Sequence, residues 1–396
     1  MRVQTAPRTI RAQPLRMRAL VLVDVGRMEL RDVRAPVLRA DEVRVRVQAV
    51  GVCGTDLHIA DGSANYNRDA RGRLVPLAEQ PQILGHEIAG VVEEVGGQVT
   101  DLHPGDRVVL DQGRNCVSER RTPVCEYCAT GHSHQCEHYA EHGITGLPGG
   151  LAEYVSIPAV NAVRVGAAIE PAVAALTEPL GCVLHACAML ALVPSRYALG
   201  AGTGGSAVRA VLVMGAGPAG LLFVQYLRTV AGFDGVLLVG EPNAHRRALA
   251  ERFGATAIDA AAIDVGDAVR EHTHGRGVEL LVEASGSGAA FAAIPRCIRK
   301  QATVLLYGHG HAGAGLGALN GVQFMEPTLV APAGASGGFE ADGRPSTYVR
   351  ALRLIERGAV DVASLITHRY PSLEAAPRAF AGDHRDAAYV KGVVLS

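Results

Sequence analysis

The segment at residues 211–220, Val-Leu-Val-Met-Gly-Ala-Gly-Pro-Ala-Gly, constrains the fold of this chain more than any other feature. Its four leading apolar residues predict a buried strand, and residues 218–230 predict an apolar helix that begins within the glycine turn. Gly215, Gly217 and Gly220 let a strand turn tightly, let the backbone approach a pyrophosphate, and let the helix pack on the sheet. The segment therefore predicts a dinucleotide-binding turn, since it combines the glycines with both flanking elements.

Strands and helices continue to alternate after this turn. The predicted elements are strands at 236–239, 280–282 and 303–307 and a helix at 244–253. Repeated strand–helix–strand units of this kind predict an α/β domain with a doubly wound parallel sheet.

The dinucleotide site is expected to extend beyond the three glycines. Pro218 and Ala219 begin the helix whose N-terminus faces the phosphate charge. Glu241 ends the second predicted strand, about 20 residues after the turn, where a carboxylate binds the ribose hydroxyls of NAD. NAD is favoured because this carboxylate repels a 2′-phosphate, whereas Arg246 and Arg247 nearby keep NADP as the alternative.

The N-terminal part of the chain predicts a different, β-rich architecture. Short strand patterns are separated by Gly and Pro turns, and no helical period of useful length appears before Pro171. The predicted elements outside the parallel sheet are strands at 43–47, 88–95, 106–110 and 391–395, a helix at 180–192 and a Gly-rich linker at 199–206. The last strand is expected to return to the first domain.

Cys53, His86 and Glu87 indicate a metal site. They lie in Gly-Val-Cys-Gly-Thr-Asp-Leu-His at 51–58 and in Gly-His-Glu at 85–87. A thiolate, an imidazole and a carboxylate together suit Zn²⁺ when one coordination position must stay open for water or substrate. A metal of this kind next to a hydride-carrying dinucleotide indicates the oxidation of an alcohol.

These motifs resemble the zinc-dependent medium-chain dehydrogenases, as do Leu-Gly-His-Glu-Ile-Ala-Gly at 84–90 and Gly-Asp-Arg-Val at 105–108. The similarity covers nearly the whole chain from Met17. The motifs that most resemble the polyol and threonine dehydrogenase branch lie at 150–162, 177–180 and 366–370. The resemblance implies a GroES-like, β-rich catalytic domain that is interrupted by a Rossmann domain, with the cleft between the two.

The same resemblance assigns ligands to a catalytic zinc. It makes Cys53, His86 and Glu178 the zinc residues, and it places Glu87 as an alternate ligand or a carboxylate beside the metal. Cys182 stays open as the third ligand instead of Glu178, because residues four apart share a helix face. A buried structural role is the commoner one for such a cysteine.

Thr55 and His58 complete the expected active site by resemblance. A hydroxyl beside the metal can pass on the proton of the alcohol, and a histidine with a pKa near 6.5 can release it to water. Asp56 has two open roles, either orienting His86 or capping a helix.

A second set of cysteines, Cys116, Cys125, Cys128 and Cys136, resembles the structural zinc lobe of this family. Four thiolates close a tetrahedral site with no open position. Residues 117–124 contain an insertion that makes Cys116 the least regular member, yet a longer loop can still close on a metal because loop entropy rises slowly with length. The histidines that could substitute for a cysteine are His132, His134 and His138.

The composition is that of a globular protein with ample core, with 48% hydrophobic residues, 19% charged residues and a net charge of −1 over 396 residues. Such a charge gives no general attraction for nucleic acid or an anionic membrane, and no apolar run reaches the length of about 18 residues that a span needs. Eight cysteines without a secretion signal favour metal ligation and free thiols in the cytoplasm. Only Lys300 and Lys391 are lysine, which we interpret as coding bias.

Two segments lie outside these motifs. Residues 1–16 are basic and predict a disordered N-terminal extension. Residues 61–82 are polar and lengthen the separation between Cys53 and His86. They predict either a solvated loop or a lip over the substrate cleft.

These features predict an NAD-dependent dehydrogenase with two zinc ions per chain that reversibly oxidises a hydroxyl of a small polar alcohol, such as a polyol, a sugar or a 3-hydroxy amino acid. The alternatives are a zinc-free enone or quinone reductase on the same scaffold, which the metal residues oppose, and a nucleic-acid-binding zinc protein, which the net charge opposes. The resemblance implies a homodimer or homotetramer, with no nucleic-acid or membrane partner. The expected domains are the extension at 1–16, the catalytic domain at 17–183, the Rossmann domain at 184–330 and, at 331–396, a part that completes both.

Overall fold

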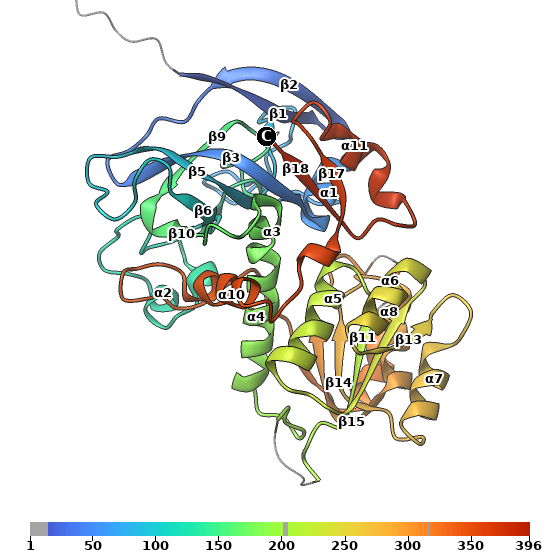
Figure 1. Cartoon of the computed structure of the whole chain (residues 1–396). Coiled ribbons are helices and arrows are strands. Elements are labelled where there is room, and N and C mark those ends of the chain that lie inside the picture. Colours follow the sequence, from blue (N-terminus) through green and yellow to red (C-terminus); the bar gives the residue numbers. More distant parts are fainter. Residues whose placement is uncertain (1–14, 201–204, 312, 316) are drawn as a thin grey trace, which may run out of the picture.

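The computed structural model describes residues 15–200, 205–311, 313–315 and 317–396. Its two domains meet along a central helix, with the N-terminal strands in one domain and the parallel sheet in the other (Figure 1). Residues 1–14 of the expected N-terminal extension at 1–16 lie outside the described residues, and Arg16 already begins the first strand. The central part of the expected 199–206 linker, 201–204, also lies outside them.

The first domain is built from two antiparallel-rich sheets. A three-stranded sheet has the order β2-β1-β4, and a seven-stranded sheet has the order β10-β6-β5-β3-β18-β17, with β9 also paired to β3. The strands are β1 (Arg16–Asp24), β2 (Arg27–Arg34), β3 (Glu42–Val52), β4 (Gln82–Ile83), β5 (Glu87–Val95), β6 (Arg107–Leu110), β9 (Tyr154–Pro158), β10 (Ala162–Arg164), β17 (Ile366–Tyr370) and β18 (Lys391–Leu395). In β3, Val43, Val45 and Val47 are buried and alternate with more exposed arginines, so the period of two is confirmed.

The C-terminal strand returns to this first domain, as predicted. β18 pairs antiparallel with β3, with Gly392 opposite Val52, and parallel with β17. Figure 1 shows the two red strands lying beside the blue β3. The last residues of the chain are therefore brought next to the segment that carries Cys53.

The second domain contains a six-stranded parallel sheet of order β13-β12-β11-β14-β15-β16. Its strands are β11 (Ala210–Met214), β12 (Val236–Glu241), β13 (Thr256–Asp259), β14 (Val278–Glu283), β15 (Ile298–Leu306) and β16 (Thr328–Val330). Its helices are α5 (Pro218–Gln225), α6 (Ala244–Arg252), α7 (Val265–His272), α8 (Gly288–Cys297) and α9 (Ala318–Gln323). The strand order reverses between β11 and β14, which is the position where such sheets bind a dinucleotide.

Helix α4 (Thr177–Leu192) joins the domains. One continuous core contains Ala49 of β3, Leu184 of α4 and Val213 of β11. The helical stretch Pro171–Leu192, which includes α3 (Pro171–Ala175), is long and apolar enough to cross a membrane, but 72% of its apolar window is buried inside the protein. Burial of this kind is typical of a core helix, and α10 (Ser346–Glu356) covers part of it.

Some helices differ from the sequence prediction. A short helix, α1 (Gly54–Ala60), follows Cys53 directly, in the part of the chain where the sequence shows no helical period of useful length. It has no long apolar period and is instead held by a capping box in which Asp56 accepts from the N–H of Cys53 at 2.9 Å. The predicted helix at 218–230 is α5 followed by a π-helical turn at Tyr226–Val230.

The remaining elements are small. They are β7 (Gly113–Arg114), β8 (Ala140–Glu141), α2 (Glu126–Ala129), α11 (Pro377–Ala381) and 3-10 turns at Ser133–Gln135, Ala159–Asn161, Ala363–Leu365 and Asp383–Arg385. β16 is the last strand of the parallel sheet, and both later strands in the described part of the chain belong to the first domain.

Candidate active site

Cys53, His86 and Glu87 come together although a long loop separates them in the sequence. Their ligand atoms all lie within 4.8 Å of one another. Cys53 follows the end of β3 and Glu87 begins β5, and these two strands are paired with Gly51 opposite Glu87. Strand pairing therefore builds this group, and the length of the 61–82 loop does not affect it.

His86 is oriented by a buried carboxylate. Its Nδ1 lies 3.4 Å from Oδ1 of Asp56, which is fully buried and also accepts from the N–H of Gly85 at 3.0 Å. Asp56 thus fulfils both roles that the sequence left open, since it caps α1 and faces the imidazole. Burial lowers the pKa of His86, but the charges of Asp56 and Cys53 outweigh this effect and raise it well above its usual value.

Glu87 is paired with a lysine from the far end of the chain. Its Oε1 forms an ion pair with Nζ of Lys391, and both side chains are buried. The other oxygen, Oε2, has no hydrogen-bond partner among the described residues. Burial lowers the pKa of Lys391, but the charges of Glu87 and Cys53 and the hydrogen bond to Glu87 together raise it by more, so the lysine stays protonated.

Glu178 and Cys182 contact each other on α4 and lie outside the three-residue group. The thiol of Cys182 donates to Oε1 of Glu178 at 3.2 Å, and Nε2 of Gln112 donates to the same oxygen at 3.2 Å. Burial and the charge of Glu178 raise the pKa of Cys182 well above its usual value, which keeps it a thiol. Tyr348 in turn donates to Gln112, so this carboxylate is held by a buried polar network.

The two residues expected to move a proton both lie on α1. The hydroxyl of Thr55 is 3.8 Å from the sulfur of Cys53. His58 is exposed, and its Nδ1 lies 3.0 Å from the hydroxyl of Ser63. Helix α1 thus carries a hydroxyl beside the candidate metal ligands and an imidazole that is exposed to solvent.

The donor set fits a zinc ion with an open position. Cys53, His86 and Glu87 supply one sulfur, one nitrogen and one oxygen, the ligand types that zinc binds in catalytic sites. Oε2 of Glu87 is buried without a hydrogen bond among the described residues, and such an atom is costly unless a ligand satisfies it.

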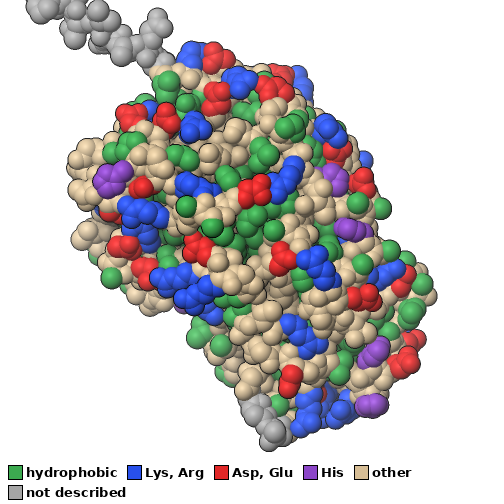
Figure 2. Space-filling view, in the orientation of Figure 1, with side chains coloured by type: hydrophobic (Ala, Val, Ile, Leu, Met, Phe, Trp, Pro, Cys, Tyr) green, Lys and Arg blue, Asp and Glu red, His purple; other side chains and the backbone are tan. Residues whose placement is uncertain are grey.

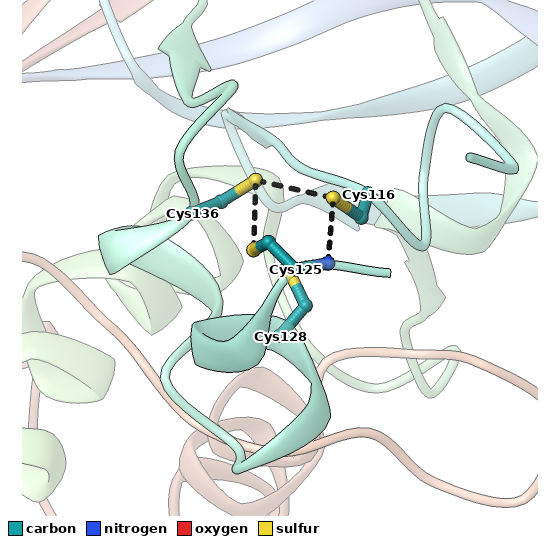
Figure 3. A group of neighbouring side chains, drawn as sticks. All are labelled: Cys116, Cys125, Cys128 and Cys136. Atoms are coloured by element: carbon teal, nitrogen blue, oxygen red, sulfur yellow. Dashed lines mark hydrogen bonds between the residues drawn. The ribbon is translucent and has the colours of Figure 1, made fainter. Parts of the chain in front are cut away.

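The four cysteines of the second set converge at one point (Figure 3). The sulfur of Cys136 lies 3.6 Å from that of Cys116 and 3.8 Å from that of Cys125. Four sulfurs at about 2.3 Å from a zinc ion are separated by about 3.8 Å, so the spacing fits a closed tetrahedral site. Hydrogen bonds from the backbone of Cys128 and Glu137 lower the pKa of Cys125 to about 6, which favours its thiolate.

Cys116 belongs to this cluster despite the insertion that follows it. The N–H of Cys125 donates to its sulfur at 3.4 Å, and the loop returns because the N–H of Arg121 donates to the carbonyl of Cys116. His134, one of the substitutes considered, is buried elsewhere, with Nε2 3.3 Å from Asp111 and Nδ1 accepting from the N–H of Ala335. The group in the described residues contains the four cysteines and no histidine.

The glycine turn has the geometry that a dinucleotide requires. Gly215 has φ +93°, and a Cβ on Gly220 would lie 1.9 Å from the carbonyl of Gly215, so neither position accepts a side chain. A Cβ on Gly217 would meet nothing within 4 Å, which leaves open space at the N-terminus of α5. Pro218 and Ala219 form the first turn of that helix, so the turn fits a pyrophosphate.

Glu241 ends β12 beside this turn. Its carboxylate accepts from the N–H of Ala216 at 2.7 Å and of Asn243 at 2.8 Å. Arg246 and Arg247 are engaged elsewhere. The guanidinium of Arg246 donates to the carbonyl of Tyr389, and that of Arg247 forms an ion pair with Asp259.

Lys391 and Gln112 are two residues that the motif analysis did not assign to the site. Gln112 lies in no motif, so the sequence carried no signal for it. Lys391 did carry one, because it is one of two lysines among 38 basic residues. Its burial against Glu87 shows that coding bias does not account for this position.

The fold and the site define a two-domain oxidoreductase. One domain carries the candidate metal ligands, and the other carries a glycine turn that fits a dinucleotide. Residues 39–167 match the family model of the alcohol dehydrogenase GroES-like domain, and residues 218–357 match that of the zinc-binding dehydrogenases. An L-threonine 3-dehydrogenase of Anaeromyxobacter sp. is 32% identical over 86% of this chain and 88% of that protein. The L-threonine 3-dehydrogenase of Pyrococcus abyssi is 30% identical over 89% of this chain and 90% of that protein.

A zinc-binding dehydrogenase from Sinorhizobium meliloti, solved with NADP, is 29% identical, with a TM-score of 0.77 over 96% of this chain and 100% of that chain. Galactitol-1-phosphate dehydrogenase from Escherichia coli, at 24% identity and a TM-score of 0.75 over 96% of this chain and 100% of that chain, shares the fold. The chain therefore belongs to the zinc-dependent medium-chain dehydrogenases, on the side of the threonine and polyol dehydrogenases. As a member, it is an NAD(P)-dependent oxidoreductase that acts on CH–OH groups.

Proposed function

We propose that this protein oxidises a hydroxyl of a small polar alcohol with NAD, using a zinc ion held by Cys53, His86 and either Glu87 or Glu178. The observation that carries the proposal is the open group of Cys53, His86 and Glu87 next to the dinucleotide domain. Tyr307 follows β15 of that domain. Burial raises the pKa of its phenol, and the charge of Glu178 raises it further.

The residues of this chain have separable roles in that reaction. When bound, the zinc ion lowers the pKa of a substrate hydroxyl and stabilises the alkoxide. Asp56 holds His86 in the orientation that ligation needs. Thr55 accepts the proton of the alcohol beside Cys53, and His58 releases it to solvent at the exposed face of α1.

The substrate class follows from polar groups around the metal residues. Tyr66, from the 61–82 loop, has a pKa raised by burial and by the charges of Cys53 and Glu141, so it lies near them. The same loop packs on Gly146, where a Cβ would lie 2.6 Å from Oδ1 of Asn67. We therefore assign this loop as a lip over a polar substrate, such as a polyol, a sugar or a 3-hydroxy amino acid. The L-threonine 3-dehydrogenases among the relatives support the last of these.

NAD is the proposed cofactor in preference to NADP. Glu241 presents a buried carboxylate at the end of β12, and neither Arg246 nor Arg247 is free to bind a 2′-phosphate. The solved Sinorhizobium meliloti relative carries NADP, so the two cofactors must be compared directly. Steady-state kinetics with both, in the wild type and Glu241→Ala, tests this. A wild type that prefers NADP contradicts the assignment.

Two zinc ions per chain are expected, one at the open group and one at Cys116, Cys125, Cys128 and Cys136. Metal analysis of protein purified without chelator should return about two equivalents. Cys53→Ser should lose one zinc and the activity, and Cys128→Ser should lose the other, while Cys297→Ser, a buried cysteine outside both groups, should keep both. A catalytically active protein without zinc at Cys53 would instead support the zinc-free reductase.

We also propose a cytoplasmic homo-oligomer. Phe324 is 85% exposed, and Leu319 and Leu329 are exposed near it, at the end of the parallel sheet where β16 is the edge strand. On the face in Figure 2, basic and acidic side chains are interspersed. Light scattering on Phe324→Glu and wild type tests the assembly. A monomeric wild type overturns it.

A further inference from the structure

A second contact between a buried carboxylate and a basic side chain lies at the carboxyl ends of β14 and β15. Glu283 is the last residue of β14 and is fully buried, and its Oε2 lies 2.8 Å from Nε2 of His311. Its Oε1 accepts from the N–H of Ser285 at 2.9 Å and of Gly286 at 3.1 Å, and also from the Ser285 hydroxyl. Since a carboxylate only accepts, Nε2 of His311 carries the proton and supplies the donor that comes from outside the 283–286 turn.

Backbone contacts also hold a short segment, residues 307–311, against the end of β14. The N–H groups of Tyr307 and Gly308 both donate to the carbonyl of Glu283, at 2.9 and 2.8 Å. A Cβ on Gly286 would lie 2.1 Å from the carbonyl of His309, so the two backbones are in close contact. His311 itself has φ +41°, a conformation that non-glycine residues adopt at a cost and that is often found where function requires it.

This segment stands at the dinucleotide site. A Cβ on Gly215 would lie 2.9 Å from that of Ser285, so the 283–286 turn touches the glycine turn directly. The adenosine ribose of the cofactor is expected beside Glu241, on β12. A dinucleotide crosses the point where the strand order reverses, so its nicotinamide half must extend over β14 and β15. Tyr307 follows β15 directly and is the first residue of this segment.

We propose that His311, acting through Glu283, is a positioning residue that holds residues 307–311 as the wall for the nicotinamide half of the cofactor. This inference rests on the dinucleotide function proposed above. With His311 removed, Oε2 of Glu283 keeps only the 3.3 Å hydrogen bond from the N–H of Gly286, and the end of the segment at residue 311 loses its side-chain attachment. The cofactor must then order that end when it binds. The free energy needed to order the segment weakens the binding of ligands that extend to β14. Ligands that bind only beside Glu241 should keep their affinity.

The experiment compares NADH with ADP, which lacks the nicotinamide half, on His311→Ala, His311→Gln and His272→Gln. His272 is an exposed histidine at the end of α7, outside this segment, and serves as the control. The chain has no tryptophan, so the fluorescence of NADH reports its binding, and competition reports that of ADP. We expect His311→Ala to raise the Kd of NADH about tenfold and leave that of ADP unchanged. The glutamine variant should recover most of the loss, because its amide can replace Nε2.

A second readout needs no cofactor. Hydrogen exchange at residues 307–311 should speed up in His311→Ala and stay unchanged in His272→Gln. An unchanged Kd for NADH in His311→Ala, or equal losses for NADH and ADP, would overturn the proposal. If the wild type binds ADP but not NADH, or neither, the dinucleotide function itself fails, and this outcome is distinguishable from the failure of His311 alone. If His311→Ala does not fold, His311→Phe, which keeps a ring but has no N–H donor, is compared with His272→Gln in its place.

Discussion

Lys391 and Glu87 form an ion pair between side chains that are 3% and 0% exposed, although 304 residues separate them in the sequence. Lys391 begins β18 and Glu87 begins β5, and both strands flank β3, which leads to Cys53. A buried charge is tolerated only when it is paired, so each residue depends on the other. The pair also engages one oxygen of Glu87 and leaves the other oxygen available to bind a metal ion together with Cys53 and His86.

Lys391→Met should therefore destabilise the protein strongly. Removing one partner of a buried ion pair costs about 3–5 kcal/mol, because the other charge remains buried and unpaired. Lys300→Met, at the other lysine of the chain, which is exposed, should change the free energy of unfolding by no more than about 0.5 kcal/mol. Urea unfolding of both variants measures this. The double variant Lys391→Met with Glu87→Gln should recover part of the loss, and equal effects of the two lysine changes would refute the pairing.

Glu178 and Cys182 can be separated by experiment as ligands of the catalytic metal. Cys182 is held as a thiol by burial and by Glu178, so Cys182→Ser keeps a donor to that carboxylate and should cost little activity. Glu178→Ala should lower turnover by at least about tenfold and loosen one zinc while the cysteine lobe keeps the other. Activity and zinc content of both variants are measured side by side. The reverse pattern, with Cys182→Ser losing a zinc, would make the thiolate the ligand.

Gly217→Ala should separate cofactor binding from stability. A methyl group there meets nothing within 4 Å, so the free energy of unfolding should change by no more than about 1 kcal/mol. The same methyl group enters the space for the pyrophosphate and should raise the Kd of NADH by about tenfold or more. Gly220→Ala, which places a Cβ 1.9 Å from the carbonyl of Gly215, should destabilise the domain instead. Normal NADH binding by Gly217→Ala would show that the turn does not hold the phosphates.

His142 should make the protein less stable in mild acid. Burial lowers its pKa to about 4, and its Nδ1 donates to the carbonyl of Pro148 at 2.8 Å. The unfolded chain, with a histidine pKa of about 6.5, binds this proton more readily, so stability is lost as the pH falls from about 6.5 through about 4. The full loss is about 3 kcal/mol from this group. Urea unfolding between pH 7 and pH 4 should show a flatter slope in His142→Gln, while exposed His272→Gln should keep the wild-type slope.

The sequence correctly predicted the features that depend on contacts between residues close together along the chain. The glycine turn needs Gly215 and Gly220 because of backbone contacts within a few residues, and the alternation of valines in β3 reports one buried face. The strand at 391–395 was also recognisable, since its apolar residues are contiguous. Helix α1 was missed because a capping box at Cys53 holds it, without a long apolar period.

Sequence alone thus determined the two domain types, the glycine turn, and the residue types that suit zinc and a dinucleotide, because each of these depends on neighbours along the chain. Only the tertiary structure decided which distant residues meet. It placed Lys391 against Glu87, joined Cys116 to the other cysteines across an insertion, and set Glu178 beside Cys182 outside the group of Cys53. The physical reason is that strand pairing and helix packing fix these contacts, and burial then sets the charge that each group carries.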